Sequence, residues 1–177
     1  MTLPFNLKSR ALRGVLWFGS LGHIRHYRGH GIHSPFMYAL VRNVLMKHPR
    51  KRGDTTLYES LRRQHVGHRT ALHIQNLHNY CKYPNVVILD KTPPVETIVP
   101  QTTYIVTGSA GIDDTQAILA PIGESECMLY IVAPRRTRTR LRACREIIRR
   151  ADCVSVDKGG FMFFVFNRRL QKQHYKL

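Results

Sequence analysis

The fold is decided by residues 127–166, which read CMLYIVAPRRTRTRLRACREIIRRADCVSVDKGGFMFFVF. The apolar run over 127–133 is typical of a buried strand, and the Arg-rich stretch 136–150 that follows it has helical spacing. Two further strand-like runs, 153–157 and 161–166, are separated by a Lys-Gly-Gly turn, which predicts a hairpin. A strand, a helix and a strand in succession predict parallel strands with the helix packed on their sheet, and the hairpin adds an antiparallel strand.

Two more strands are expected before this stretch. Residues 86–90 begin with an apolar run and end at Asp90, and residues 103–107 read TYIVT. Asp113 or Asp114 can cap a short helix that follows them. The second half of the chain therefore predicts an α/β fold of three layers, built on a sheet of about five strands, four parallel and one antiparallel.

The first half has a different character and is predicted to be a basic, helical region. We expect an arm and cap over residues 1–82 and the α/β domain over 83–177. Ser34 can cap a helix, and Pro35 suits the first helical position after it. Further helices are expected over residues 7–21, 56–65 and 70–81.

The charge of the chain is strongly positive and unevenly distributed. It has 28 Lys and Arg residues against 11 Asp and Glu, a net charge of +17, and residues 1–82 hold only two of the acids. Residues 47–54 (KHPRKRGD) form a basic turn within that half. Such a surface attracts phosphate, nucleic acid or an acidic protein partner. The alternative is an ordinary domain of basic composition, since net charge governs encounter and solubility more directly than purpose.

Four widely spaced cysteines are interpreted as reduced, mostly buried thiols of a cytoplasmic protein: Cys81, Cys127, Cys144 and Cys153. No apolar run approaches the ~18 residues that a membrane-spanning helix needs. The apolar stretch within the first arm is short and lacks a small-x-small cleavage site, so no secretion signal is expected.

A short motif in the first half resembles a known family. Residues 28–36 read RGHGIHSPF, and the residues that carry the likeness are His30, Gly31, His33, Ser34, Pro35 and Phe36. They are similar to the HGxHSPF signature that opens a group of bacterial methyltransferase-like proteins, related to the class I S-adenosylmethionine-dependent enzymes. Residues 70–90 resemble the helix that leads into the first strand of their sheet, and residues 161–175 resemble their last strand and basic tail.

The resemblance implies a Rossmann-like methyltransferase sheet with S-adenosylmethionine as its cofactor. In that sheet the antiparallel strand at 161–166 lies between the strands at 127–133 and 153–157. A family member with its active site intact also has an acidic pair after the strand that matches 127–133. This chain has Ala133-Pro134-Arg135-Arg136 there, which reverses the local charge.

The cofactor-binding half departs furthest from the family, and its degenerate region lies near Asp90 and Gly108. The chain contains no GxGxG loop, and the first strand runs into Lys91-Thr92-Pro93-Pro94, where two prolines remove backbone donors. Only residues 91–102 separate the first two strands, whereas each strand–helix–strand unit needs ~30 residues. The resemblance thus implies a shortened, degenerate member that lacks part of the cofactor-binding half.

The candidate anion-binding site is a row of arginines at helical spacing: Arg138, Arg142, Arg145 and Arg149. From the same helix we expect Leu141, Cys144 and Ile148 to face the sheet, and Arg140 to widen the basic surface. Binding of phosphate or of an acidic partner is one interpretation of the row. A basic face that only contacts solvent is the other.

No metal site is expected in the histidine cluster, which comprises His23, His26, His30 and His33. No acid or cysteine is interleaved with these residues, and Arg25 and Arg28 would repel a cation. A structural role in anchoring the arm is favoured, and contact with an anion is the alternative.

These observations leave several functional hypotheses. The favoured one is a methyltransferase-like pseudoenzyme that binds no S-adenosylmethionine and has a binding or structural role. The enzyme alternative is an active methyltransferase with a rebuilt cofactor site, for example across a homodimer. A basic nucleic-acid-binding module and a relic without activity complete the set. The sequence identifies no catalytic residue.

Overall fold

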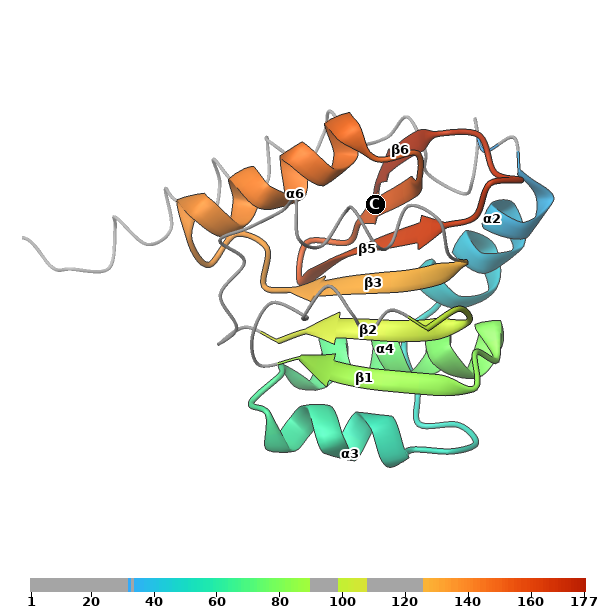
Figure 1. Cartoon of the computed structure of the whole chain (residues 1–177). Helices are drawn as coiled ribbons and strands as arrows, with labels where there is room; N and C mark the ends of the chain where they lie inside the picture. Colours follow the sequence, from blue (N-terminus) through green and yellow to red (C-terminus); the bar gives the residue numbers. More distant parts are fainter. Residues whose placement is uncertain (1–31, 33, 90–98, 108–125) are drawn as a thin grey trace, which may run out of the picture.

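The strands of the protein form one mixed sheet in the order β1-β2-β3-β5-β4-β6 (Figure 1). The structure is a computed structural model that describes residue 32 and residues 34–89, 99–107 and 126–177. The strands are β1 Asn85–Leu89, β2 Thr102–Val106, β3 Cys127–Val132, β4 Val154–Asp157, β5 Phe161–Phe166 and β6 Gln173–Lys176. All five strands predicted from the sequence are therefore present.

The directions of the strands confirm the predicted insertion of the hairpin. β1, β2 and β3 are parallel neighbours, and their arrowheads point to the left in Figure 1. β5 points the other way and pairs antiparallel with both β3 and β4, with Phe164 opposite Leu129 on one side and Ser155 on the other. Gly159 has a φ of 81° in the turn between β4 and β5, a conformation that glycine adopts without strain.

The sixth strand corrects the sequence analysis, which predicted a basic tail after residue 166. β6 lies parallel to β4, with Tyr175 in register with Val156. Only 1% of the Tyr175 surface is exposed, because its ring packs into the same core cluster as the strands. The short polar segment of β6 is held by backbone pairing with β4 and by the buried ring of Tyr175. Its polar composition alone does not indicate a strand.

The helices begin close to the predicted positions. They are α2 Pro35–Leu40, which continues as the π-helix η2 Val41–Leu45, then α3 Thr56–Arg63, α4 His68–Cys81 and α6 Arg138–Arg150. The Ser34 hydroxyl accepts a hydrogen bond from the Met37 backbone N–H at 3.3 Å, and Pro35 occupies the first helical turn. Both residues therefore have the capping roles predicted for them.

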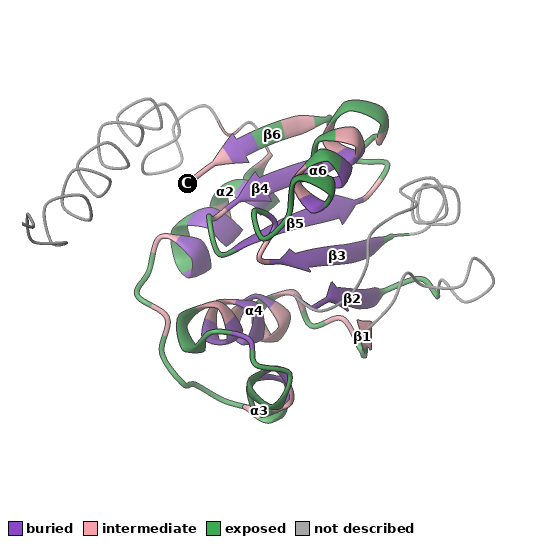
Figure 2. Ribbon diagram, turned by 90° about the vertical axis from the view of Figure 1, so that its left-hand side faces the viewer, coloured by how far each residue is buried: buried purple, intermediate pink, exposed green. Residues whose placement is uncertain are grey.

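The helices cover both faces of the sheet, so the fold is a three-layer α/β arrangement. Strand side chains alternate between the faces, and Ile105, Tyr130 and Phe163 pack with the core residues of α2, η2, α3 and α4. Leu129 and Phe164 pack on the opposite face against α6. Burial is complete along β2 to β5 and incomplete along β1 at the edge (Figure 2).

Several predictions concern residues outside the described part of the chain. They are the helices over 7–21 and near 113–120, the histidine cluster, and the segment 91–98 after the first strand. The described helices before residue 82 share a core with the sheet, while the division of the chain at that residue stays a prediction. Within the described ranges no helix combines the length and apolar character needed to cross a membrane.

Replacing Tyr175 with alanine tests the importance of β6. Truncation of a fully buried aromatic side chain costs about 3–5 kcal/mol, so we expect the Tyr175→Ala variant to lose most of that amount in the free energy of unfolding. Urea denaturation measures the loss. Gln171→Ala, an exposed change just before the strand, is the control, and we expect it to stay within about 0.5 kcal/mol of the parent. Equal stability of the two variants would mean that β6 does not hold the core.

Candidate functional site

The carboxyl ends of β2 and β3 are joined by a buried arginine. Arg140 lies in the first turn of α6 and is 4% exposed. Its Nε donates to the backbone oxygen of Val132 at 3.0 Å. Its Nη2 donates to the backbone oxygens of Val106 at 3.1 Å and Thr107 at 2.7 Å. The expectation that Arg140 widens the basic surface is therefore wrong.

The charge of Arg140 is enclosed in the protein, and burial lowers its pKa, with a further contribution from the cation of Arg136. An arginine side chain nevertheless keeps its charge under all ordinary conditions. The partial negative charges of the three backbone oxygens offset the positive charge of the guanidinium. This edge of the sheet thus contains a fixed positive charge directed at the strand ends.

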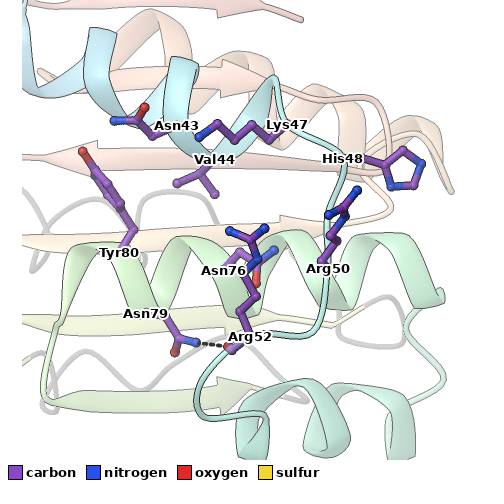
Figure 3. Close-up of a pocket in the computed structure, with 9 residues that line it drawn as sticks. All are labelled: Asn43, Val44, Lys47, His48, Arg50, Arg52, Asn76, Asn79 and Tyr80. Carbon is purple, nitrogen blue, oxygen red and sulfur yellow. Dashed lines mark hydrogen bonds between the residues drawn. The ribbon is translucent and has the colours of Figure 1, made fainter.

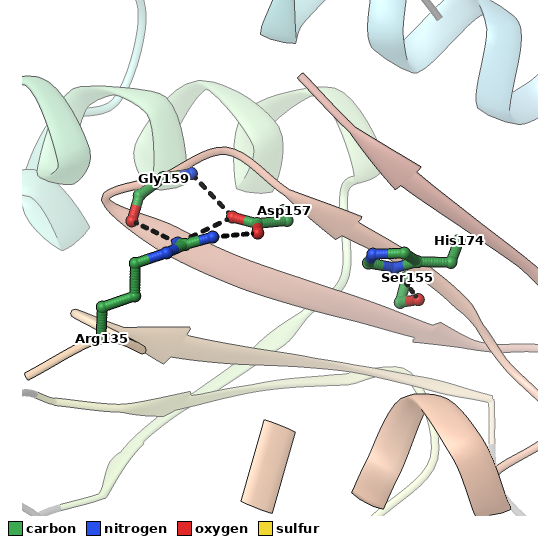
Figure 4. A network of polar contacts seen from close by, with 5 residues as sticks. All are labelled: Arg135, Ser155, Asp157, Gly159 and His174. Atoms are coloured by element: carbon green, nitrogen blue, oxygen red, sulfur yellow. Dashed lines mark hydrogen bonds and ion pairs between the residues drawn. The ribbon is translucent and has the colours of Figure 1, made fainter. Parts of the chain in front are cut away.

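A second arginine at the same edge is paired with an acid. The Arg135 guanidinium forms an ion pair with the Asp157 carboxylate and also donates to the Gly159 backbone oxygen (Figure 4). The Gly159 N–H donates to the carboxylate as well, at 2.9 Å. Burial opposes ionisation of Asp157, but the hydrogen bonds from Arg135 and Gly159 outweigh it, so the pKa of Asp157 is lowered. The acid and the cation therefore fix the turn that follows β4.

A cavity of about 380 Å³ opens beside this edge, between the α3–α4 turn and the end of β3. Its lining includes His65, Thr70, Ala133, Arg136 and Gly160. Ala133 has a φ of 49°, an uncommon conformation for a residue with a side chain, which turns the chain from β3 toward α6. The lining offers a cation at Arg136, the His65 imidazole and the Thr70 hydroxyl, and none of its described residues is an acid or a cysteine.

The structure also brings together a serine and a histidine that the sequence did not connect. The Ser155 hydroxyl lies 2.9 Å from Nδ1 of His174 (Figure 4). The two residues face each other across β4 and β6 in the strand register, and Ser155 is buried. A substrate cannot reach a hydroxyl enclosed in this way, so the pair supports strand pairing and carries no catalytic role.

The predicted arginine row is exposed along α6, as expected. Arg149, however, donates two hydrogen bonds to the Glu146 carboxylate, at 2.9 and 3.0 Å, so its charge is already partnered. The other three, Arg138, Arg142 and Arg145, make no ion pair with a described residue. The row therefore presents three exposed cations that form no ion pair within the described part of the chain. Arg149 and, to a lesser extent, Arg142 lower the pKa of the Glu146 carboxyl.

The buried stripe of α6 is rotated relative to the prediction. Leu141 and Ile148 are half-buried, while the fully buried positions are Arg140, Ala143, Cys144 and Ile147. These four follow the i, i+3, i+4, i+7 spacing of a helix face packed on a core. The rotation explains why Arg140 points inward, because it occupies the first position of the buried stripe.

The remaining predicted site residues are only partly placed. Asp90, Gly108, His30, Gly31 and His33 lie outside the described residues. Phe36, the last residue of the signature, is exposed on α2 next to the capping pair. In the described part of the chain no cluster of His, Cys, Asp and Glu could hold a metal ion.

Comparison with family models, with curated proteins and with solved structures finds no match for this chain. The methyltransferase resemblance therefore stays a prediction from the sequence motifs.

Replacing Arg140 with methionine tests its part in the sheet. Three carbonyl oxygens lose their charged donor, and each buried polar group left unpaired costs about 1–3 kcal/mol, so we expect a loss of at least ~2 kcal/mol in the free energy of unfolding. Arg142→Met on the exposed face of the same helix is the matched control and is expected to change stability by less than ~0.5 kcal/mol. Guanidinium denaturation compares the two. A similar effect of both substitutions would contradict the role assigned to Arg140.

Removal of Arg135 tests the Arg135–Asp157 pair. Arg135→Ala leaves a buried carboxylate with one remaining donor, and we expect a loss of about 1–2 kcal/mol at neutral pH, moderated by the exposure of the arginine. In an Asp157→Asn background the same change is expected to cost much less, which a double-mutant cycle measures.

The pH dependence of this pair follows from the lowered pKa of Asp157. The stabilisation is present above the ordinary carboxyl pKa of 3.8 and is lost as the pH falls through the lower value of the folded protein. The parent protein should therefore lose this contribution in acid, while the Asp157→Asn variant should not. If the free energy of unfolding fell with pH by the same amount in both proteins, the role assigned to the Asp157 carboxylate would be contradicted.

Proposed function

We propose that this chain is a shortened methyltransferase-like protein that does not bind S-adenosylmethionine and that acts by binding polyanions through the exposed arginines of α6. The observation that carries the proposal is the division of α6 into an exposed row of arginines and a buried Arg140 guanidinium at the carboxyl ends of β2 and β3. This is the edge at which doubly wound α/β sheets hold their ligands.

The strand order supports the methyltransferase-like part of the proposal. The second half of a class I methyltransferase sheet consists of parallel strands followed by an antiparallel strand that enters between the last two of them. β5 has this relation to β3 and β4. The placement needs a hairpin that folds back into the sheet, which is a less common device than the addition of a strand at an edge.

The topology and the charge both argue against S-adenosylmethionine. Ligands in such sheets occupy a crevice at the point where the strand order reverses. Among the described strands β1 is at the edge and the order β1-β2-β3 runs in one direction, so this set contains no such point. The cofactor also carries a positive sulfonium, and the described cations nearest this edge are Arg135, Arg136 and Arg140. The described residues at the edge therefore do not fit it.

The polyanion-binding part of the proposal is based on the outer face of α6. Arginine presents a planar fork of donors that matches phosphate oxygens. Arg138, Arg142 and Arg145 offer three such forks that form no ion pair with a described residue, on a helix whose other face is fixed to the sheet. A rigid row of cations suits a regular row of anions, as in a nucleic acid backbone, more closely than a single small ligand.

The proposal places the protein in the cytoplasm. Cys127, Cys144 and Cys153 are buried and unpaired, and burial raises the pKa of each thiol to about 12. Free thiols of this kind are typical of proteins in reducing compartments.

The salt dependence of DNA binding tests the function. Each phosphate contact contributes about 0.9 to the slope of log affinity against log salt, so replacing Arg138, Arg142 and Arg145 with glutamine should reduce the slope by about 2.7. Fluorescence anisotropy with a labelled duplex measures both slopes. The control replaces Arg63, Arg69 and Lys82, exposed cations of the opposite helical layer, and is expected to change the slope less. Equal slopes for the parent and the α6 variant would reject the row as the binding element.

A thermal-shift titration separates the enzyme alternative from this proposal. A ligand that binds the folded state raises the melting temperature, so millimolar S-adenosylmethionine or S-adenosylhomocysteine is expected to leave it unchanged. A clear rise with either compound would favour an active methyltransferase with a rebuilt cofactor site.

A further inference from the structure

A second basic site lies on the opposite layer from α6. A cleft of about 590 Å³ runs between η2 and α4 and is closed at one end by the loop that precedes α3 (Figure 3). Its lining residues are Asn43, Val44, Lys47, His48, Arg50, Arg52, Asn76, Asn79 and Tyr80. This volume lies within the ~300–1,000 Å³ range of small-molecule sites.

The loop that carries the arginines is fixed to α4 by two linked amide side chains, of which only Gln75 is buried. Asn79 donates from Nδ2 to the backbone oxygens of Arg52 and Asp54, both at 3.1 Å. Its Oδ1 accepts from the Gln75 amide at 2.7 Å, and the buried Gln75 in turn accepts from the Tyr58 N–H at 2.8 Å. The loop backbone is thus positioned before any ligand arrives, which lowers the entropic cost of binding.

The cations of the cleft gather without an acidic partner. Figure 3 shows Arg50 and Arg52 on the loop side of the cleft and the Lys47 ammonium directed toward Asn43, with the His48 ring turned away. Among the described residues no acid lines the cleft, and Asp54, which lies just beyond it in the chain, accepts hydrogen bonds from the backbone N–H and hydroxyl of Thr56. Three like charges held together repel one another, and a bound anion relieves that repulsion.

The other end of the cleft has a different chemistry. Tyr80 is 39% exposed, and its ring stands beside Val44 and the Asn43 amide (Figure 3). The side-chain amides of Asn43 and Asn76 make no hydrogen bond to another described residue, so these amide groups are available to a ligand. An exposed aromatic ring with amides nearby suits a flat heterocycle, which stacks on the ring and bonds through its edge.

We propose that this cleft binds a nucleoside di- or triphosphate, with the phosphates at Arg50 and Arg52, the base against Tyr80 and the Lys47 ammonium between them. The two ends of the cleft match the two ends of such a ligand. The same unit occurs free and at the 5′ end of a nucleic acid strand, and the experiment separates these sources. The site is independent of the arginine row of α6, which lies on the other face of the sheet.

Calorimetric titration with ATP tests the proposal on the full chain. We expect binding by the parent protein and at least a tenfold loss of affinity in the Arg50→Gln/Arg52→Gln variant, since each arginine contributes charge-assisted hydrogen bonds to phosphate. Arg63→Gln/Arg69→Gln removes the same charge from exposed positions outside the cleft and is the matched control, with less than a threefold change expected. Circular dichroism confirms that each variant is folded.

Two further probes separate the parts of the ligand. Tyr80→Ala is expected to weaken ATP severalfold while leaving tripolyphosphate, which has no base, unchanged. An equal effect on both probes would overturn the placement of the base. A 5′-triphosphorylated RNA oligonucleotide that binds more tightly than ATP, and loses this affinity in the Arg50→Gln/Arg52→Gln variant, would assign the site to a strand end.

Absence of ATP binding at millimolar concentration, or equal affinity of the parent and the Arg50→Gln/Arg52→Gln variant, would overturn the proposal. The variant without Arg138, Arg142 and Arg145 is expected to retain ATP binding. A loss there would instead assign ATP to the surface of α6, so failure of the cleft and failure of the proposed function give different results.

Discussion

The guanidinium of Arg140 is the interaction on which the carboxyl edge of the sheet depends. Parallel strands diverge into separate connections at this edge, and their last carbonyl groups leave the regular ladder. One side chain bonds oxygens from the ends of both β2 and β3, and it enters from the first turn of the helix that follows β3. Two strands and a helix are therefore fixed by a single planar group with several donors.

A buried cation also restricts what can lie beside it. Its removal from water is costly, and the surrounding carbonyl dipoles offset that cost only while they point at it. The neighbouring Arg135 is compensated by Asp157, which gives this part of the edge a neutral pair and a separate fixed positive charge. Helix α6 thus has two electrostatic sides, with one arginine bound to the sheet and three that face solvent and form no ion pair with a described residue.

The sequence predicted the parts of the fold that have strong local signals. β3 and β5 are long apolar runs, and the glycine turn before Phe161 marks the hairpin, so their existence and pairing follow from the residues. The place of β5 inside the sheet came from the family resemblance. β6 was missed because a four-residue polar segment becomes a strand only through its neighbour β4 and the burial of Tyr175.

The sites show the same division between local and distant information. The exposed row on α6 was predictable, because helical spacing alone places it. The inward direction of Arg140 was not predictable, because an apolar pattern is read from leucine and isoleucine and not from arginine. Two of the carbonyl oxygens that bind Arg140 also lie at the end of β2, more than thirty residues earlier in the chain. The basic turn at 47–54 was also visible in the sequence, but its amide partners on α4 meet it only in the folded chain.

The positive charge of the chain also affects whether copies can pair at the β1 edge of the sheet. No described strand lies beyond β1, and Val87 on it is 38% exposed, so this edge offers backbone groups to which a strand of another molecule could be added. A net charge of +17 makes copies of the chain repel one another, and this repulsion weakens as ionic strength rises. The same arginines and lysines that attract anions therefore oppose the pairing of two copies at an edge that has no described neighbouring strand, and high salt weakens this repulsion.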